Sequence, residues 1–180
     1  MLRPWLLTPL LFTLSLVQAV AAGIGITQEF SAREGLPNFF NKIQRGESIV
    51  IGYIGGSITR AEGYRVLSEE WIENEYTNPN VNGINAGVGG TASQLGVFRL
   101  GEGVLDANPD LVFIEFAVND GSPSNTDNLK KAREGMVRQV WRKNPFTDIC
   151  FLYTIKDDFL SDLQNDIFPV AAAAHDEVAA

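Results

Sequence analysis

The fold is decided by the stretch SIVIGYIGGSIT, residues 48–59. The run over residues 49–54 is rich in isoleucine, valine and tyrosine, a composition typical of a buried strand. Gly55 and Gly56 then let the backbone turn sharply, which leaves the hydroxyl of Ser57 exposed at the carboxyl edge of a sheet. Ser57 is therefore the first candidate for a nucleophile.

Apolar runs of this kind alternate with amphipathic helical stretches along the chain, which is typical of an α/β domain with a mainly parallel sheet. With 180 residues and 45% hydrophobic content, the chain is long enough for one domain with a core. Residues 159–180, after the fourth strand, are expected to form one or two helices, broken at Pro169. We expect the strands at residues 49–54, 81–86, 111–116 and 148–153.

Helices are expected between these strands, each with one apolar face against the sheet. Thr91 or Ser93 is the candidate N-cap of the second helix. The basic residues of the third helix, Arg133 among them, are expected mostly outside its apolar stripe. Trp71 and Trp141 are both accounted for by apolar faces, so no exposed aromatic platform for a sugar is evident. The apolar faces consist of Tyr64, Leu67, Trp71 and Ile72 on the first helix, Leu95, Phe98, Val104 and Leu105 on the second, and Leu129, Ala132, Met136, Val137, Val140 and Trp141 on the third.

Residues 1–22 have the organisation of a secretory signal peptide. Arg3 provides a positive start, residues 6–17 are largely apolar, and residues 19–21 (AVA) form a small-x-small cleavage signal. The apolar stretch is shorter than the ~20 residues that span a bilayer, and an uncleaved anchor is the alternative. We therefore expect an exported protein, secreted or periplasmic and without stable membrane insertion, whose domain occupies residues 23–180.

Charge and composition argue against several classes of function. The formal net charge of −8 argues against a nucleic-acid surface, which needs clustered Lys and Arg. Cys150 is the only cysteine and lies in an apolar run, so we expect a buried, unreactive thiol. His175 is the only histidine, which leaves no cluster of the kind that a zinc site needs. We expect no metal or other cofactor.

Polar segments follow three successive strands, at residues 55–59, 87–91 and 119–120. Because parallel strands end at the same edge of a sheet, these segments meet where open α/β folds bind their ligands. The chemistry that fits is acyl transfer, in which Ser57 would attack an ester carbonyl. The backbone N–H groups of Ser57 and Gly90 and the amide of Asn119 would stabilise the oxyanion. Taken singly, each segment is equally compatible with a structural turn, a loop or a helix cap.

Together these segments resemble, in chain order, the first three blocks of the SGNH (GDSL-type) hydrolases. Ser57, Gly90 and Asn119 match the family's serine, glycine and asparagine. The resemblance implies a three-layer, flavodoxin-like α/β/α sandwich and the hydrolysis of esters or thioesters of lipids and carbohydrates. Members with a GGSIT block resemble carbohydrate esterases that remove acetyl groups, so a small-molecule or carbohydrate ester is the implied substrate. The matching blocks are GGSIT at residues 55–59, NAGVGGT at 85–91 and EFAVND at 115–120, within a region of resemblance over roughly residues 48–155.

The chain departs from the family's pattern in three places. Gly56 stands where an aspartate is common and Ala117 where a glycine is usual, and neither change removes a reacting group. The family's final block carries Asp and His three residues apart, whereas His175 has Ala172 at that offset. His175 lies in the alanine-rich segment over residues 171–180, and we expect it on the surface of a helix rather than in catalysis.

The third departure leads to an expectation about the chain as a whole. The chain is expected to lack a C-terminal portion that holds a fifth strand and the Asp-x-x-His block. A serine without a base is a poor nucleophile, so negligible esterase activity is expected of these 180 residues. The strand at 148–153 would then be an uncovered edge of the sheet.

Two further expectations concern one carboxylate and one alternative function. Glu115 lies in an otherwise apolar strand, where it is expected either to accept hydrogen bonds from Thr59 or Arg60 or to be exposed at the strand's end. The alternative function, from a different class, is a non-catalytic carbohydrate-binding or scaffolding module of the same fold.

Overall fold

Parallel β-strands form the centre of the molecule. The computed structural model describes residues 30–76 and 80–180, so the expected signal peptide lies outside the described residues. One four-stranded sheet has the order β2-β1-β3-β4, and all of its neighbouring strands are parallel. Each strand agrees with its prediction to within one residue at either end. The strands are β1 (Ile49–Gly55), β2 (Val81–Gly87), β3 (Leu111–Glu115) and β4 (Asp148–Leu152).

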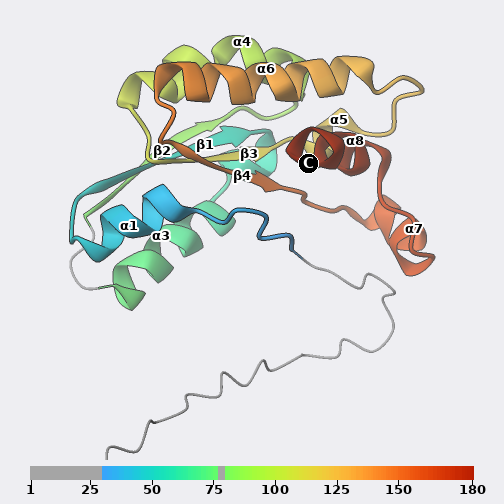
Figure 1. The fold of residues 1–180 in the computed structure, drawn as a ribbon. Helices are drawn as coiled ribbons and strands as arrows, with labels where there is room; N and C mark the ends of the chain where they lie inside the picture. Colours follow the sequence, from blue (N-terminus) through green and yellow to red (C-terminus); the bar gives the residue numbers. More distant parts are fainter. Residues whose placement is uncertain (1–29, 77–79) are drawn as a thin grey trace, which may run out of the picture.

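Helices cover both faces of this sheet (Figure 1). One face carries α1 (Pro37–Gln44) and α3 (Tyr64–Glu75), and the other carries α4 (Ser93–Gly103) and α6 (Asp127–Lys143). The predicted three-layer α/β/α sandwich is therefore confirmed. Helix α1 was not predicted, because it precedes the first apolar run and buries only Phe39 and Ile43.

Short elements connect these layers and end the described chain. Helix α8 packs against α6 and α5, and it begins after Pro169, as predicted (Figure 1). Within residues 30–76 and 80–180, every helix is too short or too polar to span a bilayer. The short elements are α2 (Ser57–Arg60), η1 (Leu105–Ala107), α5 (Ala117–Asp120), η2 (Asp157–Phe159), α7 (Leu160–Gln164) and α8 (Val170–Ala179).

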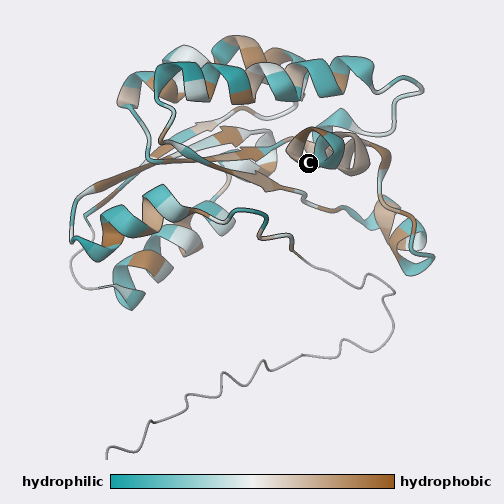
Figure 2. Ribbon diagram, in the orientation of Figure 1, coloured by the Kyte–Doolittle hydropathy of each residue, from teal (hydrophilic) through white to brown (hydrophobic). Residues whose placement is uncertain are grey.

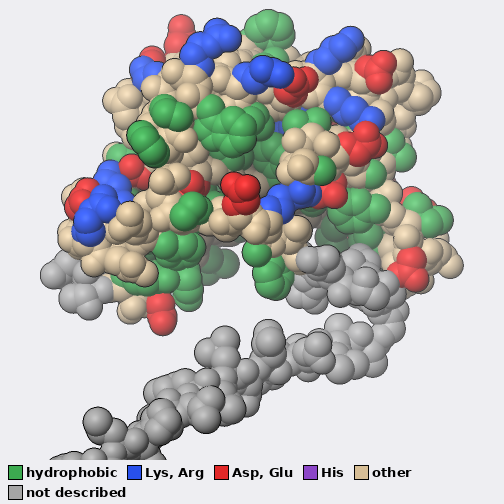
Figure 3. Space-filling view, viewed as in Figure 1, with side chains coloured by type: hydrophobic (Ala, Val, Ile, Leu, Met, Phe, Trp, Pro, Cys, Tyr) green, Lys and Arg blue, Asp and Glu red, His purple; other side chains and the backbone are tan. Residues whose placement is uncertain are grey.

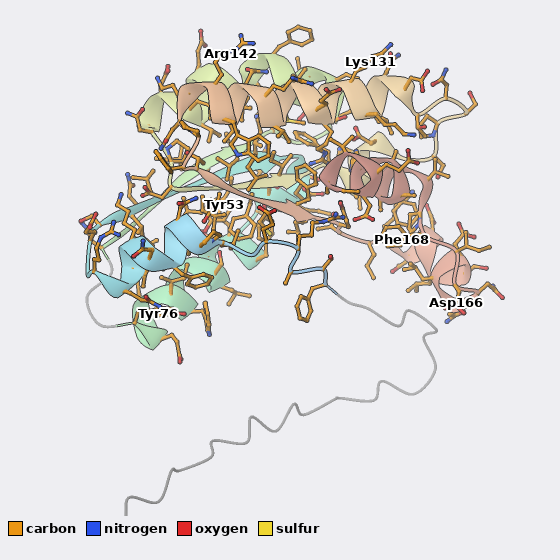
Figure 4. All side chains as sticks on the ribbon, in the orientation of Figure 1. Tyr53, Tyr76, Lys131, Arg142, Asp166 and Phe168 are labelled. Carbon is orange, nitrogen blue, oxygen red and sulfur yellow. The ribbon has the colours of Figure 1, made fainter. Side chains whose placement is uncertain are left out.

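The hydrophobic core lies on both sides of the sheet, where Figure 2 shows the apolar colour along the strands. Alternate residues of β1 face opposite layers. Ile54 packs with the α4 and α6 side chains, whereas Ile51 and Tyr53 pack with those of α1 and α3. Figure 4 labels Tyr53, whose ring stacks on Phe113 with a centroid distance of 5.2 Å. Burial on both faces explains why β1 is apolar almost throughout.

The helix faces are where the sequence-based predictions fail most. The hydroxyl of Tyr53 lies 2.9 Å from the Ser68 hydroxyl, so α3 presents a partly polar face to the sheet. Arg133 is completely buried, although Lys131 and Arg142 on the same helix extend away from the sheet (Figure 4). Hydrophobic side chains accordingly reach the surface at several places in Figure 3. The residues predicted to be buried that are in fact exposed are Leu67, Trp71, Leu95, Phe98 and Trp141.

Two smaller predictions also need correction. Ala92, rather than Thr91 or Ser93, occupies the N-cap of α4, and its side chain makes no capping bond. Cys150 is only partly buried, but burial still raises the pKa of its thiol to about 11, which agrees with the expected lack of reactivity. Strand β4 pairs only with β3 in the described sheet and is an edge strand, as expected.

Candidate active site

Ser57 lies at the carboxyl end of β1, where it begins the short helix α2 and is exposed. The glycines before it are required by close packing rather than by an unusual backbone angle, since Gly56 has a φ of −87°. A β-carbon placed on Gly55 would lie 2.5 Å from the backbone oxygen of Glu115. One placed on Gly87 would lie 2.3 Å from the backbone nitrogen of Arg60. The turn at Ser57 is therefore pressed against both neighbouring strands.

The loop that carries Gly90 lies beside Ser57. A β-carbon placed on Gly89 would lie 3.7 Å from Cβ of Ser57. The N–H of Val88 donates to the Gly55 carbonyl at 3.1 Å, which ties this loop to the end of β1. Gly90 has a φ of +75°, a left-handed conformation that favours glycine. The loop thus needs glycine at position 90 for its shape.

Asn119 brings the third segment to the same place. A β-carbon on Gly56 would lie 2.1 Å from Oδ1 of Asn119, so the carboxamide packs directly against the residue that precedes Ser57. Its Oδ1 is buried and has no hydrogen-bond partner within the described parts of the chain. Ser57, the Gly90 loop and Asn119 therefore gather at one point of the sheet edge, as the order of parallel strands predicts.

An arginine that was not predicted from the sequence joins two of these segments. Arg99 of α4 donates from Nη2 to the Gly55 carbonyl at 2.7 Å and to Thr91 Oγ1 at 3.3 Å, and from Nη1 to the Ala86 carbonyl. It thereby links the ends of β1 and β2 and the Gly90 loop. Partial burial lowers the pKa of Arg99. The residue follows the second block by eight positions, and nothing in its local pattern distinguishes it from a solvent-facing helix arginine.

Glu115 anchors the turn that carries Ser57. Its side chain is fully buried and accepts hydrogen bonds from Thr59 Oγ1 at 3.0 Å and from Thr154 Oγ1 at 2.6 Å. The expected bond from Thr59 is thus present, and exposure at the strand's end is wrong. Thr59 also lies 3.0 Å from the Tyr64 hydroxyl, and burial raises the pKa of Tyr64 to about 12.

His175 is buried, so the prediction of a surface histidine is wrong. Its Nε2 lies 2.7 Å from Oδ2 of Asp120, and its Nδ1 lies 2.5 Å from Nη2 of Arg133. A guanidinium only donates, so Nδ1 accepts and Nε2 carries the proton that is donated to Asp120. Burial lowers the pKa of His175 and also that of Arg133, the latter to about 10. With both ring nitrogens engaged, this imidazole has no free lone pair for the proton of Ser57.

The buried histidine makes stability depend on pH. The groups that surround its ring are Asp120, Arg133 and Tyr153. Because burial holds the folded pKa below the ordinary 6.5, the unfolded chain binds more protons as the pH falls below that value. Stability is therefore expected to fall between pH 6.5 and the folded pKa, with a slope of up to about 1.4 kcal/mol per pH unit.

Urea unfolding at about pH 7.5 and about pH 5 measures this dependence, with His175→Gln as the comparison. The glutamine variant lacks the titrating ring, so the contribution from position 175 should disappear and leave only the slope of the other groups. Equal slopes in the two proteins would contradict the assignment.

A surface cavity lies at the amino ends of β3 and β4, whereas Ser57 lies at the carboxyl end of β1. Its lining includes no residue of the candidate site. The described ranges also contain no group of three His, Cys, Asp or Glu side chains that could hold a metal ion. The cavity is lined by Asn38, Asn41, Lys42, Arg45, Asp110, Asn144 and Phe146.

Several solved structures with a similar fold are esterases or acylhydrolases. A two-domain esterase active on acetylated mannans, co-crystallised with mannopentaose, is 29% identical with a TM-score of 0.67, over 80% of this chain and 38% of that one. An acetyl xylan esterase is 23% identical with a TM-score of 0.59, over 73% of this chain and 72% of that one. A lipase/acylhydrolase from Enterococcus faecalis is 22% identical with a TM-score of 0.52, over 73% of each chain.

These comparisons define the class of fold. The chain has the α/β/α architecture of known esterases and acylhydrolases, and it spans 38% of the length of the mannan esterase. The two matches below 25% identity bear on the fold alone. No family model matches the chain, and no curated protein matches it in sequence.

Proposed function

We propose that this chain belongs to an exported serine ester hydrolase of the SGNH type that removes acetyl groups from carbohydrate. The observation that carries the proposal is the meeting of Ser57, the Gly90 loop and Asn119 at one sheet edge. The likeness to an esterase active on acetylated mannans supports a carbohydrate ester as the substrate. Export rests on the signal-like sequence of residues 1–22.

In the proposed mechanism, Oγ of Ser57 attacks the ester carbonyl carbon and forms a tetrahedral intermediate. The N–H groups of Ser57 and Gly90 and Nδ2 of Asn119 donate to the oxyanion. Each such donor typically stabilises the transition state by ~3 kcal/mol. The alcohol then leaves with a proton, and water hydrolyses the acetyl-serine. Attack requires a base that takes the hydroxyl proton of Ser57.

No histidine within these 180 residues is free to act as that base. His175 is the only one, and both of its ring nitrogens are already bonded. In another serine hydrolase, loss of the histidine costs on the order of a million-fold in turnover. We therefore propose that the chain by itself turns over esters at a negligible rate, while its serine and oxyanion donors remain in place.

A chemical rescue experiment tests both parts of this proposal. The chain and its Ser57→Ala variant are incubated with an aryl acetate, with and without added imidazole, and acetylation of Ser57 is measured by mass spectrometry. Without imidazole, the two proteins should release alcohol at the same rate. Dissolved imidazole can supply the missing base, so Ser57-dependent acetylation should then rise at least about tenfold, towards the range of about 10²–10⁴ typical of general-base catalysis.

Each part of the proposal can be contradicted by one result of this experiment. Serine-dependent turnover without imidazole would contradict the proposed inactivity. If the aryl acetate does not acetylate Ser57 in the presence of imidazole, the proposed role of Ser57 as nucleophile is contradicted. Ser161→Ala, at an exposed serine of α7, is the matched control and should behave like the unsubstituted chain.

A second candidate function is a non-catalytic carbohydrate-binding module. The observation that favours it is the exposure of Trp71 and Trp141, which are 53% and 54% accessible, so part of each aromatic side chain is open to a ligand. Such a module would bind acetylated oligosaccharides equally well after Ser57→Ala and would not be acetylated in the presence of imidazole. The rescue experiment therefore separates the two functions.

A further inference from the structure

Asp120 joins two of the three segments of the candidate active site. It directly follows Asn119 in the chain, and its Oδ1 accepts the hydrogen bond of the Ser93 N–H at 2.8 Å. Ser93 begins α4, immediately after the Gly90 loop. The carboxylate accepts one of the N–H groups at the start of α4 that have no partner within the helix, and a negative charge is favourable at the N-terminus of an eleven-residue helix. The position of one carboxylate thus connects the Gly90 loop with Asn119.

His175 holds that carboxylate from the other side. The ring donates from Nε2 to Oδ2 of Asp120, and neither side chain is exposed at all. Arg133 fixes the other ring nitrogen and also donates from Nη1 to the Ile114 carbonyl at 3.1 Å, at the end of β3. The guanidinium lies over the Phe151 ring, 4.7 Å from its centroid. The histidine is therefore clamped between a carboxylate and a cation that is itself anchored to the sheet.

We propose that Asp120 and His175 are positioning residues of the candidate active site, through which α8 fixes the position of the Gly90 loop relative to Asn119. This inference rests on the proposed function for its catalytic consequence, but the link between the two segments can be measured without catalysis. Neither residue acts on the substrate in this proposal. His175 acts only through Asp120, by keeping one of its oxygens bonded so that the other stays on Ser93.

Two substitutions at position 175 separate this role from mere packing. His175→Gln keeps one acceptor and one donor, whereas His175→Leu keeps neither. The readout is hydrogen exchange of the Ser93 amide by NMR. The matched reference is the Val50 amide, which also donates to a carboxylate, that of Asp110, at 2.8 Å and at the opposite edge of the sheet.

The expected result is a loss of hydrogen-exchange protection that is confined to the Ser93 amide. In His175→Leu, the protection of the Ser93 amide should fall at least about tenfold relative to that of Val50, which is the loss of about 1.4 kcal/mol that one buried hydrogen bond represents. His175→Gln should retain most of the protection. An unchanged Ser93 amide in the leucine variant, or equal losses at Ser93 and Val50, would overturn the proposal.

A kinetic arm links the network to the proposed chemistry. In the imidazole-rescued reaction, His175→Leu should lower kcat with KM unchanged, and His175→Gln should restore kcat. A normal kcat in the leucine variant would overturn the catalytic consequence. If the unsubstituted chain is not acetylated at all, the proposed function fails, and the exchange result alone decides the link between the segments.

A second measurement applies if His175→Leu does not fold. The amide chemical shift of Ser93 is then followed in the unsubstituted chain as the pH is lowered through the titration of His175. A step that His175→Gln abolishes supports the proposal, and a flat profile in both proteins overturns it.

Discussion

Asp120→Ala is expected to lower the free energy of unfolding by about 3–5 kcal/mol, the cost of leaving one member of a buried charge pair alone. Both oxygens of this carboxylate are bonded, one to the Ser93 amide and one to His175. Without it, the completely buried guanidinium of Arg133 loses the negative charge that acts on it most strongly, and only the weaker effect of Glu115 remains. Urea unfolding measures the loss, which would be a large fraction of the stability of an ordinary domain.

Two control variants sharpen this prediction. Asp106→Ala removes a carboxylate whose side chain is 72% exposed and should change stability by no more than about 0.5 kcal/mol. Adding Arg133→Met to Asp120→Ala removes the stranded cation, so the double variant should recover part of the loss. If the double variant is less stable than Asp120→Ala, the buried charge of Arg133 is not the cause of the loss, and the prediction is contradicted.

Asn119→Ala is expected to lower the imidazole-rescued acetylation of Ser57 by about 10²–10³-fold, the usual cost of removing one oxyanion donor. The carboxamide packs against Gly56, directly before Ser57. In the proposed mechanism, its loss therefore removes one of the donors to the oxyanion. Stability should change far less than the rate, because Oδ1 of Asn119 makes no hydrogen bond within the described residues. Mass spectrometry of acetyl-Ser57 measures the rate.

The matched control for this prediction is Asn128→Ala. Asn128 is an exposed asparagine of α6, and its removal should leave the acetylation rate within about twofold of the unsubstituted chain. Equal rates in Asn119→Ala and Asn128→Ala would show that the carboxamide of Asn119 stabilises no oxyanion.

The gathering of Ser57, the Gly90 loop and Asn119 could be expected from the sequence, because it follows from two local facts. Each segment comes directly after an apolar run, and parallel strands end at the same edge of a sheet. Thr59 as a donor to Glu115 could be expected as well, since a carboxylate in an apolar strand needs a partner.

The helix faces could not be judged in the same way. Helical periodicity shows that an apolar stripe exists, but which part of it meets the sheet depends on the rotation of the helix in the packed layer. Helix α3 places Ser68 on Tyr53 and leaves Leu67 and Trp71 exposed, and α4 leaves Leu95 and Phe98 exposed. Arg133 and Arg99, which look like surface cations in the sequence, bond to backbone carbonyls of other elements.

Local composition was thus sufficient to predict the strands, their parallel arrangement and the segments that follow them. The reason is that strand formation and tight turns depend on residues that are adjacent in the chain. The burial and hydrogen bonding of His175 depend on the tertiary structure alone. Its partners, Asp120 and Arg133, lie 55 and 42 positions away, and their burial depends on α8 packing against α5 and α6. A histidine in an alanine-rich helix becomes a neutral, fully bonded core residue only when such distant groups remove it from water.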